Sequence, residues 1–159
     1  MLKIIQIIEF ESQYSKDFAR LNYEWIEEYF AVEPYDREML DNPNEFIIGC
    51  GRRIIFALSG EEVVGTVALI KTDDDSFELA TMAVTEKCRG LKIGNKLMRV
   101  CIEYSKKVGK TRLFLLSNTK LTSALNLYKK NGFQEIPLDP QTPYQRTDIQ
   151  MELLLENIK

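Results

Sequence analysis

The sequence contains no histidine, and this absence excludes every site whose chemistry depends on an imidazole. Histidine-based triads, histidine general bases and histidine metal ligands are all ruled out, and we expect no bound metal. The three cysteines, Cys50, Cys88 and Cys101, form no C-x-x-C pair. A scattered, odd-numbered set of this kind is typical of a reducing compartment rather than of a disulfide framework.

Long apolar segments are also missing. The N-terminal run from Ile4 to Ile8 is interrupted by Gln6 and stops at Glu9, so it is too short for a signal peptide or a membrane span. The net charge of -3 offers no overall basic surface to a nucleic acid. We therefore expect a cytoplasmic protein that binds neither membranes nor nucleic acids. Whether it forms a homodimer is left open.

The composition that remains is ordinary for a globular protein, with 45% hydrophobic and 28% charged residues. A length of 159 residues predicts a single domain, residues 1–159, with a substantial core. Repeats, low-complexity segments and interdomain linkers are absent from the sequence.

Hydrophobic periodicity and turn residues predict a mixed α/β fold with the element order β-α-α-β-β-β-α-β-α-β-β. Short turns join the strands expected near 52–58, 63–70 and 77–84, which predicts an antiparallel meander. The helix expected over 93–108 leads to a nearly continuous apolar strand at 112–117, which is typical of a parallel crossover unit. The expected central sheet is therefore mostly antiparallel with one parallel βαβ pair. Further helices are expected near 14–30, 36–40 and 119–131.

The stretch from Glu78 to Gly94, together with the strand that begins at Phe77, carries the main functional signal. Strict alternation along its strand predicts two faces, with Phe77, Leu79, Thr81 and Ala83 on one and Glu78, Ala80, Met82 and Val84 on the other. Glu78 is thus a carboxylate on an otherwise apolar face. The following loop is basic and contains glycine, and it leads into a helix N-terminus, where free N–H groups favour a phosphate or pyrophosphate. The alternative is an ordinary strand-to-helix connection with a solvated basic loop.

Two common nucleotide-binding patterns, G-x-x-x-x-G-K-S/T and G-x-G-x-x-G, are absent, which argues against a nucleotide-binding module. The loop instead resembles the coenzyme A loop of the GNAT superfamily of N-acetyltransferases, Q/R-x-x-G-x-G/A. Arg89 and Gly94 fill its first and last positions, and Lys92 stands where the middle glycine is expected. A second segment, residues 124–133, is similar to the family's A-x-x-L-Y-x-x-x-G-F, with Tyr128 as its tyrosine. The resemblance covers nearly the whole chain and implies a GNAT-like fold.

This resemblance implies acetyl transfer from acetyl-CoA to an amine, by direct attack of the neutral amine on the thioester. Contacts with acetyl-CoA are implied at the strand end, the loop, the helix start and the next strand, namely at Met82, Ala83, Val84, Arg89, Gly90, Leu91, Lys92, Ile93, Gly94, Asn95, Asn118 and Tyr128. Lys92 either hinders the close approach of backbone and phosphate or pairs with a phosphate. Because of Lys92, the alternative function is a non-catalytic acyl-CoA sensor.

Two residues are expected to move protons. Tyr128 would donate a proton to the leaving thiolate, and the alternative is a tyrosine that only packs in the core. Glu78 would accept the amine proton through water, and the alternative is a carboxylate paired with a lysine or arginine. The acceptor amine is unidentified. Its candidate contacts are Glu24, Tyr144 and Arg146, where Arg146 either binds a substrate carboxylate or is solvated.

Overall fold

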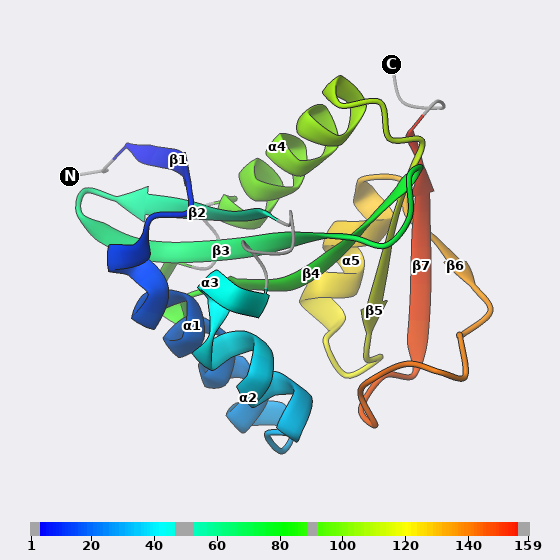
Figure 1. Cartoon of the computed structure of the whole chain (residues 1–159), viewed down its shortest axis with the longest axis horizontal. Coiled ribbons are helices and arrows are strands. Elements are labelled where there is room, and N and C mark those ends of the chain that lie inside the picture. Colours follow the sequence, from blue (N-terminus) through cyan, green and yellow to red (C-terminus); the bar gives the residue numbers. More distant parts are fainter. Residues whose placement is uncertain (1–3, 47–52, 89–91, 156–159) are drawn as a thin grey trace.

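The computed structural model describes residues 4–46, 53–88 and 92–155, and within them a seven-stranded sheet lies between two groups of helices (Figure 1). The strands are β1 Ile5–Glu9, β2 Arg53–Ser59, β3 Glu62–Lys71, β4 Ser76–Val84, β5 Arg112–Ser117, β6 Gln134–Ile136 and β7 Ile149–Leu154. The helices are α1 Ser15–Tyr29, α2 Pro34–Asp41, α3 Pro43–Phe46, α4 Ile93–Lys107 and α5 Thr122–Lys130. Short 3-10 turns cover Ser12–Tyr14 and Glu86–Cys88.

The strand order in the sheet is β1-β2-β3-β4-β5-β7-β6. Neighbouring strands are antiparallel except β4 and β5, which are parallel and are joined by the crossover helix α4. This arrangement confirms the predicted mixed α/β fold, with a mostly antiparallel sheet and one parallel pair. The short helix α3 is an addition to the predicted order.

Helix α2 begins at Pro34, before the start at residue 36 that its apolar pattern suggested. Proline suits the first helical position because its fixed φ is already helical and its missing N–H would have had no partner there. A capping box closes the same end, in which the Glu33 N–H donates to Asp36 Oδ2 at 2.8 Å. Both carboxylates are therefore fixed at the start of α2, and both also contribute to the site described below.

Each face of the sheet has its own apolar core. On the α4 and α5 face, buried side chains such as Leu69, Leu97 and Cys101 pack together. On the opposite face, Phe18 and Ile26 of α1 pack with α2 and the sheet. Figure 1 shows α4 above the sheet and α1, α2 and α3 below it. Burying each large apolar side chain contributes roughly 1.5–3 kcal/mol, so the two layers hold the sheet from both sides.

Strand β4 contains a bulge, and the predicted alternation is wrong beyond it. Thr66 of β3 pairs with Ala83, but Ala68 pairs with Ala80, so Thr81 and Met82 together oppose the one residue between them on β3. Thr81 takes a left-handed φ of 52° to accommodate the extra residue. The bulge reverses the faces. Met82 packs on the α4 side together with Leu79, and Ala83 packs on the α1 side together with Ala80.

The bulge lies where β4 separates from β5. The parallel pairing covers only Ser76, Phe77 and Glu78, opposite Arg112, Leu113 and Phe114. Beyond these pairs the two strands diverge, as Figure 1 shows. A β-bulge bends the strand that carries it and increases its twist, which accounts for the divergence at this point. No helix within the described part of the chain has both the length and the apolar character that a bilayer crossing requires.

Candidate active site

A cavity of about 480 Å³ occupies the space between the diverging strands β4 and β5. Residues 78–84 of β4 and 116–118 at the end of β5 form its walls. Helices α1 and α2 close it on one side of the sheet, and Gly94 of α4 together with much of α5 closes it on the other. Residues 144, 146 and 147 complete the lining, so segments from the whole length of the chain meet here.

The N-terminus of α4 lies at this cavity, where Gly94 contributes to the lining, and its first N–H groups have no partner within the helix. Lys92 is the N-cap residue, and its side chain makes no capping hydrogen bond. The first bond back into the helix runs from the Lys96 N–H to the Lys92 carbonyl at 3.2 Å. The N–H groups of Ile93, Gly94 and Asn95 precede it and therefore have no partner within the helix. Such a turn suits an anion, as expected.

Lys92 has φ 61° and ψ 26°, the left-handed conformation that glycine adopts without penalty. Lys92 thus has the backbone conformation that suits glycine, the residue that the resembled motif has at this position. Gly94 lines the cavity, and an added Cβ there would come within 3.1 Å of Leu127 Cδ2. Glycine at this position therefore permits the close packing of α4 against α5. Arg89, Gly90 and Leu91, the other loop residues expected to contact acetyl-CoA, lie outside the described residues.

Tyr128 lies both in the core and at the cavity, so its position fits each of the two alternatives that the sequence left open. It is 7% exposed and packs in the core, with its ring centroid 5.9 Å from that of Phe133, yet it also lines the cavity. Burial raises the pKa of Tyr128 to about 12, so the phenol stays protonated at neutral pH. Among the described residues no side-chain hydrogen bond engages its hydroxyl. A core position therefore does not exclude a proton donor, and the catalytic role stays a prediction.

The wall formed by β4 contains the expected Met82, Ala83 and Val84. Because pairing with β5 ends at Glu78, the β4 edge beyond it has no strand partner on the β5 side within the described residues. Thr81 also lines the cavity, and its buried Oγ1 lacks a hydrogen-bond partner among the residues the structure describes. A left-handed, β-branched residue costs of order 1–3 kcal/mol, and such strain clusters at functional sites.

Asn118 lies at the end of β5 in the cavity wall, as expected, but its amide is already bonded within the protein. Its Nδ2 donates to the Arg146 carbonyl at 2.6 Å, and its Oδ1 accepts from the Lys120 N–H at 2.8 Å. Asn118 therefore fastens the segment around residue 146 to the start of the α5 region. Its contact with acetyl-CoA stays a prediction.

The α1 side of the cavity presents residues that sequence reasoning missed. Asn22, Trp25, Ile26 and Tyr29 all line it. Their spacing of 3, 4 and 7 residues places them on one face of α1, a periodicity that could have identified them. The Trp25 Nε1–H donates to Asn22 Oδ1 at 3.1 Å, which fixes the orientation of the indole. This wall is therefore aromatic and ordered.

Glu24 does not belong to this face of α1, and its contact with the substrate stays a prediction. It is exposed and absent from the cavity lining, and its Oε1 accepts the Glu86 N–H at 3.4 Å. The physical reason is the helical rotation of 100° per residue, which turns Glu24 away from its neighbour Trp25. Asp36, for which the sequence left both solvent and the acceptor site open, lies in the lining and is 2% exposed.

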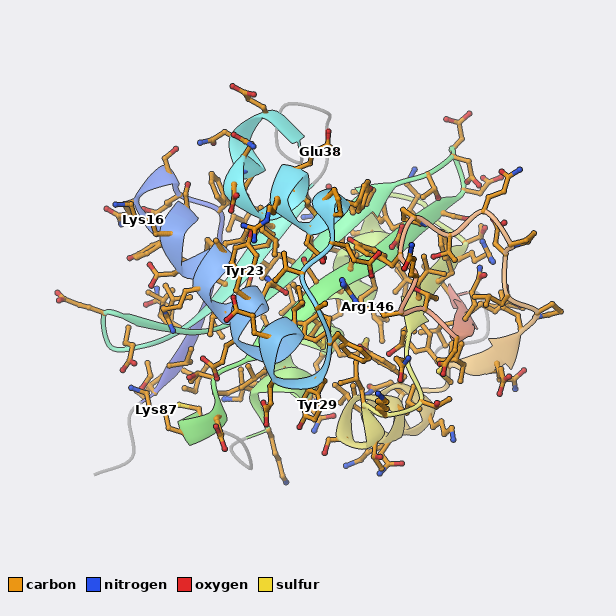
Figure 2. The ribbon with its side chains drawn as sticks, turned by 90° about the horizontal axis from the view of Figure 1, so that it is seen from below. Lys16, Tyr23, Tyr29, Glu38, Lys87 and Arg146 are labelled. Carbon is orange, nitrogen blue, oxygen red and sulfur yellow. The ribbon has the colours of Figure 1, made fainter. Side chains whose placement is uncertain are left out.

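Arg146 lines the cavity but is neither solvated nor free to take a substrate carboxylate through its fork. Its Nη1 donates to Asp36 Oδ2 at 2.8 Å and its Nη2 to Asp36 Oδ1 at 2.6 Å, a bidentate pair. Glu33 Oε2 lies 3.4 Å from Nη1. Burial alone would lower the pKa of Arg146, but the hydrogen bond and charge of Asp36 outweigh it and raise the pKa. Figure 2 shows Arg146 beside the segment that joins α1 and α2.

Tyr144 and Glu78 lie in the lining as expected. Burial, followed by the negative charge of Asp36, raises the pKa of Tyr144 well above its usual range, and Glu78 adds to the effect. The positive charge of Arg146 acts in the opposite direction and lowers the pKa of Tyr144, but it does not cancel these causes. Burial raises the pKa of Cys101 to about 12, and neither Cys101 nor Cys88 lines the cavity, so no described cysteine is placed as a nucleophile.

Comparison with known proteins gives consistent matches. A family model described as the Acetyltransferase (GNAT) family matches residues 18–133. Human N-acetyltransferase 8B is 28% identical over 120 residues, covering 67% of this chain and 53% of that protein. The crystal structure of a GNAT-family acetyltransferase from Staphylococcus aureus Mu50 is 26% identical with a TM-score of 0.86, covering 96% of this chain and 99% of that one.

A more distant structure, the PaiA N-acetyltransferase from Thermoplasma acidophilum in complex with coenzyme A, shares the fold. It is 18% identical with a TM-score of 0.73, covering 95% of this chain and 99% of that one. The chain spans about half the length of the first curated relatives it matches. The family and fold that these matches indicate are those that the two sequence motifs suggested.

Proposed function

Because the chain belongs to the Acetyltransferase (GNAT) family, we propose that it transfers an acetyl group from acetyl-CoA to a primary amine. The observation that carries this proposal is that one cavity is lined by the α4 N-terminus, Tyr128 and Glu78. The names of the relatives, which are N-acetyltransferases, support the reaction. The coenzyme A complex of the Thermoplasma protein supports the choice of co-substrate.

The α4 N-terminus would hold the pyrophosphate of acetyl-CoA, and this assignment rests on the N–H groups of Ile93, Gly94 and Asn95, which have no partner within the helix. Lys92 would add a positive charge beside them. The β5-side edge of β4 at Met82, Ala83 and Val84, which has no strand partner among the described residues, would bond the pantetheine arm in the manner of a neighbouring strand. An N–H in the same stretch would also stabilise the oxyanion that forms on the carbonyl.

Glu78 would take the proton from the ammonium through water, so that the neutral amine attacks the thioester carbonyl. A new C–N bond forms as the C–S bond breaks, and Tyr128 would protonate the departing thiolate. Its raised pKa of about 12 keeps this proton available at neutral pH. A positioned acid or base contributes typically 10²–10⁴ in rate, so these two groups account for a large share of the expected acceleration.

The test measures thiol release from acetyl-CoA with a panel of primary amines, alongside calorimetric binding of acetyl-CoA. Saturable binding with amine-dependent thiol release is the expected result. Saturable binding without turnover on any amine would instead indicate a non-catalytic acyl-CoA sensor. A thermal shift with acetyl-CoA is the simplest first measurement, since a ligand that binds only the native state raises the melting temperature. Stabilisation by ATP but not by coenzyme A would contradict both functions.

A further inference from the structure

The acceptor end of the cavity has a definite chemical character. We call it the acceptor chamber and define it as the part lined by Trp25, Tyr29, Asp36, Glu78, Tyr144 and Arg146. Three of these six residues are aromatic, two are acidic and one is basic. Such walls suit a ligand with a flat apolar body and a positive or polar nitrogen. Whether a negative group finds a positive partner in this chamber decides whether amines that also carry a carboxylate can bind.

The guanidinium of Arg146 has partners along its edge and over its faces. It donates two hydrogen bonds to the Asp36 carboxylate, at 2.8 and 2.6 Å, and the Glu33 carboxylate lies near the same edge. Its central carbon lies 4.3 Å from the ring centroid of Tyr144 and 5.4 Å from that of Trp25. Only 11% of the side chain is exposed. Arg146 therefore holds the rings of Tyr144 and Trp25 next to the start of α2, and its guanidinium is poorly available to a ligand.

The other cation in the described lining is Lys120. It is exposed, and its Nζ lies 5.6 Å from the ring centroid of Phe30, a residue outside the lining. The carboxylates of Glu33, Asp36 and Glu78 outnumber the one buried guanidinium here, so a carboxylate on the acceptor would leave water for a region of excess negative charge. Removing an ionised carboxylate from water without a partner is strongly unfavourable. An ammonium or amine placed in the same chamber meets favourable charge instead.

We propose that the acceptor is an arylalkylamine, an aromatic body carrying a primary amine with no carboxylate beside the nitrogen. This inference rests on the proposed function and specifies its acceptor. The aromatic part packs between Trp25, Tyr29 and Tyr144, and the amine points toward Glu78. Arg146 is a positioning residue that keeps the rings in place. The chamber thus selects tyramine-like acceptors over the corresponding amino acids.

The experiment compares tyramine with tyrosine, which differ only by the carboxylate. With saturating acetyl-CoA, we expect the kcat/KM for tyramine to exceed that for tyrosine by at least about 10-fold, equivalent to about 1.4 kcal/mol. Calorimetry in the presence of coenzyme A should detect tyramine binding and not tyrosine binding. Equal or better use of tyrosine would overturn the inference, as would the failure of tyramine both to bind and to react.

A matched pair of tyrosines on α1 tests the aromatic wall. Tyr29 lines the cavity and Tyr23 does not, and Figure 2 shows both on the same helix. Tyr29→Leu should raise the KM for tyramine several-fold without changing the affinity for acetyl-CoA, whereas Tyr23→Leu should leave both unchanged. An unchanged KM in Tyr29→Leu would contradict the aromatic selection. Tyramine binding without any thiol release would uphold the chamber's selectivity but refute the proposed acetyl transfer.

Discussion

Lys92→Gly is the change whose effects on stability and on binding should have opposite signs. Lys92 has a φ of 61°, a conformation that costs a residue with a Cβ roughly 1–2 kcal/mol. Glycine removes this cost but gains freedom in the unfolded chain, which offsets about 0.5–1 kcal/mol. The net expectation is a stabilisation of about 0.5–1 kcal/mol, or roughly 1–4 °C in melting temperature for a chain of this size.

The same substitution removes a cation from the start of α4, beside the N–H groups that have no partner within the helix and that we assign to the pyrophosphate. We expect the affinity for acetyl-CoA to fall and its dependence on salt concentration to weaken, because screened charge–charge attraction contributes less. Lys92→Ala is the matched control. It removes the charge but keeps a Cβ in the left-handed conformation, so it should lose affinity without gaining stability.

Denaturant unfolding measures the stability difference, provided that the variants have the same m-value. Calorimetry at two salt concentrations measures the affinity for acetyl-CoA. Equal stability of Lys92→Gly and Lys92→Ala would refute the strain argument. Tighter binding by Lys92→Gly would show that the lysine side chain obstructs the phosphate rather than pairing with it. These two outcomes address separate steps of the reasoning, so each can fail independently.

Three further predictions follow from the site and the core. Tyr128→Phe should lower kcat by about 10²–10⁴ at saturating acetyl-CoA while cofactor affinity stays within a few-fold; an unchanged kcat in a chemistry-limited regime would remove Tyr128 from the mechanism. The folded-state pKa of Tyr128 is raised from 10.0 to about 12, so its stabilising effect is complete below pH 10 and is lost as the pH rises toward 12. Tyr128→Phe should therefore lose less stability than the wild type over that window, which pH-dependent denaturation would measure. Arg146→Met should cost about 3–5 kcal/mol because it leaves Asp36 buried without its partner, whereas Lys87→Met, at an exposed ion pair, should change unfolding little.

The element order and the family could be predicted from the sequence because their signals are local. Apolar periodicity, turn residues and the segments around Arg89 and Tyr128 lie within short stretches of chain. The fold and the family matches confirm this order apart from the added helix α3, the single parallel pair and the GNAT assignment. The positions of Glu78, Tyr128 and Tyr144 in one cavity agree with the expectation, and their catalytic and binding roles stay predictions.

The faces of β4 beyond Thr81 depended on a distant strand. Strict alternation places Met82 with Glu78, but pairing with β3 inserts an extra residue and reverses the two faces. A bulge depends on the register between two strands, and no residue within β4 by itself predicts it. The same bulge accompanies the separation of β4 from β5, so the cavity itself is a consequence of strand pairing.

The environment of Arg146 was likewise decided by the tertiary structure. Its partner Asp36 is 110 residues away along the chain, and sequence reasoning treated both as candidates for solvent. The sheet carries the segment around residue 146 to the start of α2, where the two charges leave water together and pair. Charge type is fixed by the sequence, but whether a charge faces water, a ligand or an internal partner depends on contacts between segments that are remote in the chain.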